Sequence, residues 1–213
     1  MHLYLVLAVP LSYLYALVRR DEFTEPTTFT LIPVVKGVVA SIVIAALQAA
    51  LRRAWLAPAG DATVFWYYWL RDFLIPGLGG FGVYLMTIKD REGFSPRERG
   101  LSLISFYAGV FASLGLLDLV LGGPAWGVYE LFLLPTLRGV IVLGVPMLYV
   151  LYSGETMYVR FVFLAGMLAA PFVPAAVALL AVLHFTGFAV GATVVLYAGV
   201  WVATVLTASG GRP

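Results

Sequence analysis

The sequence contains no cysteine and only two histidines, His2 and His184. Without cysteine the chain has no disulfide, no zinc–thiolate site and no iron–sulfur cluster. A haem held by paired histidines would need both histidines of the chain, so it is not expected either. The sequence therefore predicts no metal site and no cofactor.

Charged residues are also scarce, at 11% of the chain against about 25% in soluble domains. The net charge of +2 gives no basis for nucleic-acid binding. Hydrophobic residues make up 62% of the 213 residues, and so few charges could not cover a surface exposed to water. The composition therefore predicts an integral membrane protein, surrounded by membrane lipid, without a sizeable soluble domain.

Apolar stretches of about the length that crosses a bilayer follow one another along the chain. About 20 apolar residues span the hydrocarbon core as a helix. Seven such stretches lie at about 3–18, 27–51, 63–88, 101–121, 128–152, 161–182 and 187–208. We expect an all-α polytopic membrane protein with seven transmembrane helices, in which 1–208 form a single bundle and 209–213 a short cytoplasmic tail.

The positive charges between these stretches indicate the orientation of the chain. Lysine and arginine are enriched in the cytoplasmic loops of membrane proteins. Eight of them follow the first, third and fifth stretches or lie in the C-terminal tail, whereas the opposite side holds only Arg52 and Arg53. The N-terminus is therefore predicted outside and the C-terminus in the cytoplasm, in a multi-pass protein of the cell (inner) membrane.

Two predicted spans share the phrase Pro-x-x-[Lys/Arg]-Gly, at 33–37 and 135–139. We interpret it as the trace of a 3+3 inverted repeat, with chance similarity of two apolar helices as the alternative. Repeat one then covers about 1–92 and repeat two about 98–182, and 187–208 is an unpaired extra helix. An odd number of spans per half inverts one half relative to the other. Pro33, Pro76 and Pro135 are the expected helix breaks.

Three bases and three acids lie within the predicted spans: Lys36, Arg71, Arg138, Asp72, Asp118 and Glu130. An arginine in the hydrocarbon core costs about 2.5 kcal/mol or more, so protein must surround it. Lys36 and Arg138 each lie about ten residues into their span, or about 15 Å deep in a core about 30 Å thick. We expect the two to meet near the midplane, where they either pair with the acids or contact an anion.

The acids are expected to form a second polar layer, near the outer face. Under the predicted topology Asp72, Asp118 and Glu130 lie at that level, with Arg71 and His184 close to it. Carboxylates and a histidine can perform acid–base chemistry. No HExxH or other spaced metal motif accompanies them, and an interfacial histidine without a catalytic role is the competing interpretation.

Glycines are spaced for close helix contact in the last predicted span. Gly187 and Gly191 form a GxxxG pattern, and Gly199 continues the small-residue spacing. Such patterns allow two helix backbones to approach each other. Packing within one bundle and a homo-oligomer through this helix are both compatible with the pattern.

The leading hypothesis is a transporter or channel whose midplane site contacts a small anionic solute or a lipid headgroup. Lys36 and Arg138 would contact the anion, Glu130 and Asp72 would gate or counterbalance them, and Arg71 would complete the site. One alternative is an intramembrane enzyme acting on lipid at the outer leaflet through Asp72, Asp118, Glu130 and His184. Another is a non-catalytic subunit of a membrane complex. We favour transport over catalysis.

Overall fold

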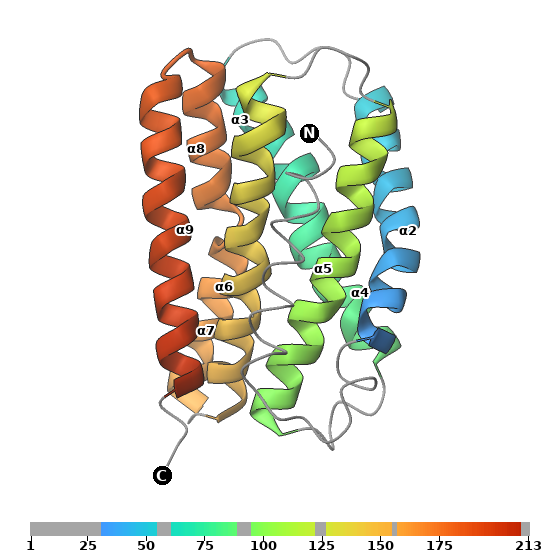
Figure 1. Ribbon diagram of the computed structural model, residues 1–213, viewed down its shortest axis with the longest axis vertical. Helices are drawn as coiled ribbons and strands as arrows, with labels where there is room; N and C mark the ends of the chain where they lie inside the picture. Colours follow the sequence, from blue (N-terminus) through green and yellow to red (C-terminus); the bar gives the residue numbers. More distant parts are fainter. Residues whose placement is uncertain (1–30, 55–60, 89–94, 122–126, 155–156, 210–213) are drawn as a thin grey trace.

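The computed structural model describes residues 31–54, 61–88, 95–121, 127–154 and 157–209 of the chain. Within these ranges the backbone is helical apart from short turns and contains no strand. The helices stand side by side in one bundle, which is drawn upright in Figure 1. The first predicted span, 3–18, and residues 210–213 of the predicted tail lie outside the described residues.

Each predicted apolar stretch from the second onward is helical where the structure describes it. Three stretches are single helices: α2 (Ile32–Ala54), α5 (Pro96–Leu121) and α9 (Thr186–Ser209). The other three are divided into consecutive pieces, some of them π-helical. The third comprises α3 (Asp61–Tyr68), η2 (Trp69–Gly79) and α4 (Gly80–Thr87). The fifth comprises η4 (Tyr129–Leu133) and α6 (Leu134–Gly154), and the sixth α7 (Met157–Ala169) and α8 (Phe172–Val182).

Five helical stretches are long and apolar enough to cross a membrane: Ile32–Leu51, Glu98–Asp118, Leu134–Leu151, Arg160–Val182 and Thr186–Thr204. The third predicted span, which comprises α3, η2 and α4, is not among them. The fold is that of a helical membrane protein. Seven spans and their orientation stay predictions. The inverted repeat also stays a prediction. α2 and α6 run in opposite directions (Figure 1), but the second and fifth spans of any bundle with alternating directions would do so with or without a repeat.

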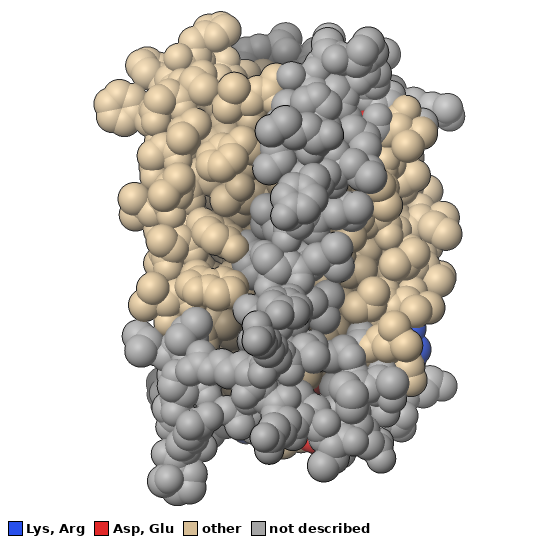
Figure 2. All heavy atoms as spheres, in the orientation of Figure 1, with Lys and Arg blue, Asp and Glu red and all other residues tan. Residues whose placement is uncertain are grey.

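The bundle turns apolar side chains outward, as a lipid-facing surface requires. The apolar part of α5 is mostly buried, whereas α2 and α9 expose most of theirs. Val39 and Ile42 of α2 and Phe188 and Val195 of α9 are among the exposed side chains. On the face shown in Figure 2, the described side chains are almost all uncharged.

Two glycines allow α2 and α5 to touch through their backbones. A Cβ added to Gly37 of α2 would overlap the carbonyl oxygen of Phe106 in α5. A Cβ added to Gly109 of α5 would overlap the carbonyl oxygen of Val34 in α2. Any larger residue would push the helices apart, so this pair of glycines fixes the crossing point of α2 and α5.

The glycines of α9 have no such neighbour. A Cβ added to Gly187, Gly191 or Gly199 would meet no described atom within 4 Å, and all three residues are exposed. Their spacing is therefore not explained by packing inside the described bundle. A homo-oligomer through this face stays a prediction.

A capping box makes α5 begin before the predicted apolar stretch. The Ser95 Oγ accepts the Glu98 N–H at 3.3 Å, and the Glu98 Oε2 accepts the Ser95 N–H at 2.7 Å. Pro96 occupies the first helical position, where its missing N–H is not needed. The S-x-x-E sequence thus satisfies the free N–H groups of the first turn. It sets the helix start at Pro96 rather than near Leu101.

Candidate functional site: a buried charge cluster

The π-helical segment η2 carries Arg71 and Asp72, and Pro76 lies inside it. In a π-helix each carbonyl oxygen accepts the N–H of the residue five positions on. For Arg71 that residue is Pro76, which has no N–H. Gln48 of α2 supplies the missing donor, because its Nε2 donates to the Arg71 carbonyl oxygen at 2.7 Å. This bond joins α2 to η2 beside the two charged residues.

Asp72 is buried and surrounded by donors. Its side chain is 2% exposed. Arg71 donates to both carboxylate oxygens, from Nε to Oδ1 at 2.7 Å and from Nη2 to Oδ2 at 2.9 Å. The hydroxyl of Tyr129, at the start of η4, donates to Oδ2 at 3.3 Å. Neighbouring helix positions do not face each other, so it is the long side chain of Arg71 that bends round to Asp72.

Arg71 also contacts two tyrosines. Its Nη1 donates to the Tyr67 hydroxyl at 3.2 Å. Its guanidinium carbon lies 5.1 Å from the Tyr67 ring centre and 5.5 Å from that of Tyr68. Aromatic faces attract cations at such distances. The tyrosines therefore hold the guanidinium of Arg71 in place against Asp72.

Arg138 reaches the same carboxylate from α6. Its side chain is 6% exposed, its Nη1 donates to the Asp118 Oδ2 at 3.0 Å, and its Nη2 lies 3.9 Å from the Asp72 Oδ1. The Nε of Arg138 is buried and has no hydrogen-bond partner. A guanidinium has five N–H donors. Arg138 therefore has donors to spare in a place where an unsatisfied donor is costly.

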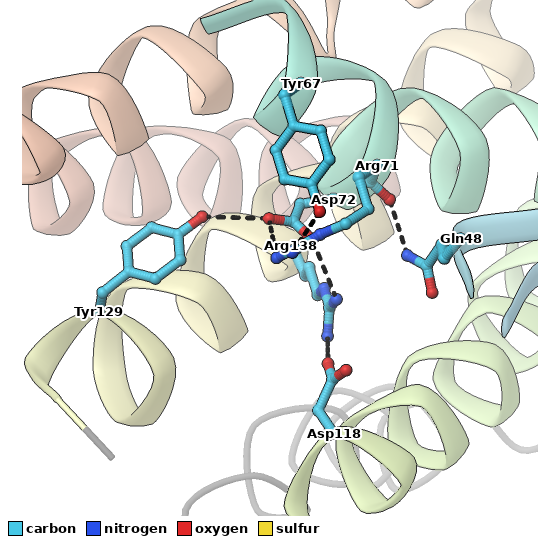
Figure 3. A network of polar contacts seen from close by, with 7 residues as sticks. All are labelled: Gln48, Tyr67, Arg71, Asp72, Asp118, Tyr129 and Arg138. Atoms are coloured by element: carbon cyan, nitrogen blue, oxygen red, sulfur yellow. Dashed lines mark hydrogen bonds and ion pairs between the residues drawn. The ribbon is translucent and has the colours of Figure 1, made fainter. Parts of the chain in front are cut away.

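Asp118 lies in the last turn of α5 and has a side chain that is 50% exposed. Its hydrogen-bond partner in the described structure is Arg138. We call Arg71, Asp72, Asp118 and Arg138 the charge cluster; Figure 3 shows the four with Gln48, Tyr67 and Tyr129 around them. Two cations and two anions leave it without net charge when all four are ionised. The cluster thus runs from a half-exposed carboxylate to a fully buried one.

Lys36 does not meet Arg138, and that expectation was wrong. The Nζ of Lys36 donates to the carbonyl oxygen of Thr87 at 2.9 Å. This contact lies toward the end of the bundle where α2 begins and α4 ends, whereas Arg138 contacts Asp118 near the opposite end (Figure 1). The position of a residue in the chain gives the depth of its Cα atom, whereas a lysine side chain can extend toward the nearer interface.

The two separate polar layers expected from the sequence are also corrected. Asp72 and Asp118 belong with Arg138, which contacts both. His184 is exposed in the turn between α8 and α9, at a positive φ of 66°, and makes no contact with the charge cluster. The side chain of Glu130 lies outside the described residues. The structure therefore does not bring His184 together with Asp72 and Asp118, as the hypothesis of a carboxylate–histidine site required.

Two of the three prolines expected to break helices lie in or next to a π-helical segment. Pro76 lies within η2, and Pro135 is the second residue of α6, directly after η4. Both adjoin π-helical turns, as the missing N–H of proline favours. Pro33 is the second residue of α2, at the edge of a described range, so the break expected there is not tested.

Gln48, Tyr67 and Tyr129 were not predicted as site residues. Gln48 carried a usable signal, because it is the only glutamine of the chain and lies within an apolar run. A buried amide in such a run needs a partner. Tyr67 lies in an aromatic run that is typical of a membrane interface. Nothing in the sequence distinguished Tyr67 or Tyr129, as a residue of the site, from an ordinary aromatic residue at the membrane interface.

The fold and the cluster define a class: a helical membrane protein with a charge-balanced polar site inside its bundle. Within the described residues, no group of three or more histidine, cysteine, aspartate or glutamate side chains is placed to hold a metal ion. Comparison with protein-family models, with curated proteins and with solved structures finds no match to this chain. A proposal about function therefore depends on the charge cluster.

Proposed function

We propose that the protein is a membrane transporter or channel that binds an oxyanion at Arg138. The observation that supports this is the incomplete bonding of a buried arginine. Its Nε has no partner, and its Nη2 lies 3.9 Å from Asp72, beyond hydrogen-bond distance. Guanidinium groups bind carboxylate or phosphate through two parallel hydrogen bonds. The ligand is accordingly the carboxylate or phosphate of a small solute or of a lipid headgroup.

Arg138, and not Arg71 or Lys36, is the anion-binding residue in this proposal. Arg71 already makes two hydrogen bonds to Asp72 and one to Tyr67. Its role is to hold Asp72 in place. Lys36 is bonded at a distance from the charge cluster and has no part in binding.

The depth of the cluster suits a site reached from one side of the membrane. At 1.5 Å per residue, Arg138 lies about 5 Å from the centre of the run 129–154, and Asp118 about 14 Å from the centre of α5. A core about 30 Å thick then places Arg138 near its middle and Asp118 at its edge. The proposal includes the predicted topology, in which the edge at Asp118 is the outer one. It also includes the inverted repeat, which would bring the broken helices to the midplane.

The test is flux through liposomes that contain the purified protein. Nitrate, lactate and phosphate would be compared with sodium and potassium, and a fluorescent phospholipid would report movement of lipid headgroups. The variant Arg138→Gln removes the charge that binds the anion, and Lys36→Gln is the matched control outside the cluster. Loss of about 1.4 kcal/mol of binding corresponds to about tenfold in affinity. Loss of a partner in a buried charge pair costs about 2–5 kcal/mol.

We therefore expect anion or phospholipid flux that falls at least about tenfold in Arg138→Gln and is unchanged in Lys36→Gln. Flux of phospholipid alone would identify the headgroup as the source of the oxyanion, and flux of solutes alone would identify a free anion. Selective passage of cations, or equal anion flux in wild type and Arg138→Gln, would contradict the proposal.

A second candidate function is that of a non-catalytic subunit of a membrane complex. The observation that favours it is the open glycine face of α9, where Gly187, Gly191 and Gly199 meet no described atom. Such a face admits a close-packed helix of another chain. Native mass spectrometry in detergent tests this candidate, with Gly191→Leu as the variant that fills the face. A single copy of the chain, bound to no other protein when isolated from its own membrane, would contradict it.

A further inference from the structure

We propose that Asp118 takes up a proton when an anion binds to Arg138, so that the protein carries a proton and a monovalent oxyanion together. This inference rests on the proposed function and adds the coupled ion. It starts from the difference between the two carboxylates beside Arg138. Asp72 keeps Arg71 and Tyr129 as donors whatever Arg138 does. Asp118 has only Arg138 as its described partner and is 50% exposed.

An ionised Asp118 and a bound anion compete for one guanidinium. If both were present, the cluster would hold one unbalanced negative charge. If neither were present, it would hold one unbalanced positive charge. An unbalanced charge inside a membrane protein is strongly unfavourable. Two states are balanced: the empty cluster with Asp118 ionised, and the loaded cluster with Asp118 protonated.

The exchange between these states moves one proton and one anion. The proton adds to a carboxylate oxygen of Asp118, which then releases the N–H of Arg138 Nη1. Two oxygens of the anion accept parallel hydrogen bonds from the Arg138 Nε, which is unpartnered in the empty cluster, and from the Nη2 beside it, which lies 3.9 Å from Asp72. No other bond forms or breaks. Entry of both ions adds no net charge, so transport is electroneutral.

Among the described carboxylates of the cluster, Asp118 is the one whose surroundings allow a change of charge. From α6 it faces Arg138, and through Arg138 the pair formed by Arg71 and Asp72 on η2. On α2 the charged residue with a described side chain is Lys36, which is bonded elsewhere. The third element packed against α5, α4, carries no charged residue. Water or headgroups reach Asp118 directly because half of its side chain is exposed.

The experiment uses the full chain in liposomes that enclose a pH-sensitive dye. Nitrate, lactate and dihydrogen phosphate serve as probes, each added outside as the sodium salt, and entry of the anion is measured separately from luminal pH. In the wild type we expect the lumen to acidify as the anion enters. The rate of anion entry should fall as the outside pH is raised, because each anion enters together with one proton.

Asp118→Asn mimics the protonated residue. In this variant we expect the anion to enter without acidification and without dependence on pH, whereas Asp118→Glu should keep both. Anion entry without acidification in the wild type would overturn the coupling and leave the proposed function standing. Acidification in Asp118→Asn equal to that in the wild type would also overturn it. The absence of any anion flux in the wild type would instead contradict the proposed function itself.

The inference can also be tested if Asp118→Asn does not fold. The wild type alone gives a second readout, because electroneutral transport is insensitive to a membrane potential. A potassium gradient with valinomycin sets that potential. Acceleration of anion entry by an inside-positive potential would show uncompensated charge movement and overturn the inference.

Discussion

Asp72→Asn should destabilise the protein much more than Asp118→Asn, although both remove a carboxylate that contacts Arg138. Asp72 is 2% exposed, and its loss leaves Arg71 and Arg138 in the bundle with one carboxylate between them. Removing one partner of a buried ion pair costs about 3–5 kcal/mol. For a chain of this length each kcal/mol lowers the melting temperature by about 2–4 °C, so Asp72→Asn should lower it by about 6–20 °C.

Asp118→Asn should cost much less. Half of the Asp118 side chain is in contact with its surroundings outside the protein, and the amide oxygen of asparagine can still accept the N–H of Arg138. Exposed ion pairs contribute about 1 kcal/mol or less, which corresponds to about 2–4 °C. The measurement is thermal unfolding of the purified variants in the same detergent. An equal or larger loss of melting temperature for Asp118→Asn would refute the assignment of Asp72 as the fixed carboxylate and Asp118 as the exchangeable one.

Two further predictions concern the same melting temperature. Gly109→Ala should lower it by about 2–12 °C, because the added Cβ overlaps the backbone of α2 and overpacking costs about 1–3 kcal/mol. Gly191→Ala, whose Cβ meets no described atom, is the matched control and should not lower it, because alanine favours a helix over glycine by about 1 kcal/mol. Gln48→Leu should cost about 1–3 kcal/mol, because the carbonyl oxygen of Arg71 loses its donor.

Each of these predictions has an outcome that would contradict it. An unchanged melting temperature in Gly109→Ala would mean that α2 and α5 do not touch at their backbones. A large loss in Gly191→Ala would mean that another chain covers the open face of α9. Gln48→Glu has no hydrogen to donate when its carboxylate is ionised, so at a pH where it is ionised it should be destabilised as Gln48→Leu is. Full stability of the glutamate variant would remove the reason given for Gln48.

The positions of the helices could be predicted because apolar runs determine them. The predicted stretch 187–208 and α9 (Thr186–Ser209) differ by one residue at each end. The start of α5 was missed by more, because a polar capping box precedes the apolar run. Ser95 and Glu98 form that box, and both are polar residues that hydropathy counts against a helix in a membrane protein. The signal was in the sequence, but in a pattern of caps and not of hydropathy.

The π-helical segments could not be predicted in the same way. Pro76 removes a backbone N–H, and a kink, a bulge or a π-helical turn can each accommodate that loss. The outcome depends on which neighbour can serve the freed carbonyl oxygen. Here that neighbour is Gln48, 23 residues earlier in the chain. Only the packing of α2 against η2 brings the two together.

The prediction of which residues form the charge cluster was wrong for a related reason. Sequence position gives the depth of a Cα atom, but long side chains carry charge along the helix axis in either direction. Lys36 extends to Thr87, away from the cluster, whereas Arg138 extends to Asp118. The paired phrase at 33–37 and 135–139 therefore led to a pairing of Lys36 with Arg138 that the structure does not contain.

The charge cluster is a poor means of holding helices together. Replacing a buried ion pair with apolar residues of similar volume is often neutral or stabilising by about 1–4 kcal/mol. α2 and α5 already touch at Gly37 and Gly109. A purely structural network would also be fully satisfied, whereas Arg138 has an unpartnered Nε and shares its best hydrogen bond with a half-exposed carboxylate. A cluster that is balanced in charge, incompletely bonded and exposed at one end fits exchange of partners better than fixed support.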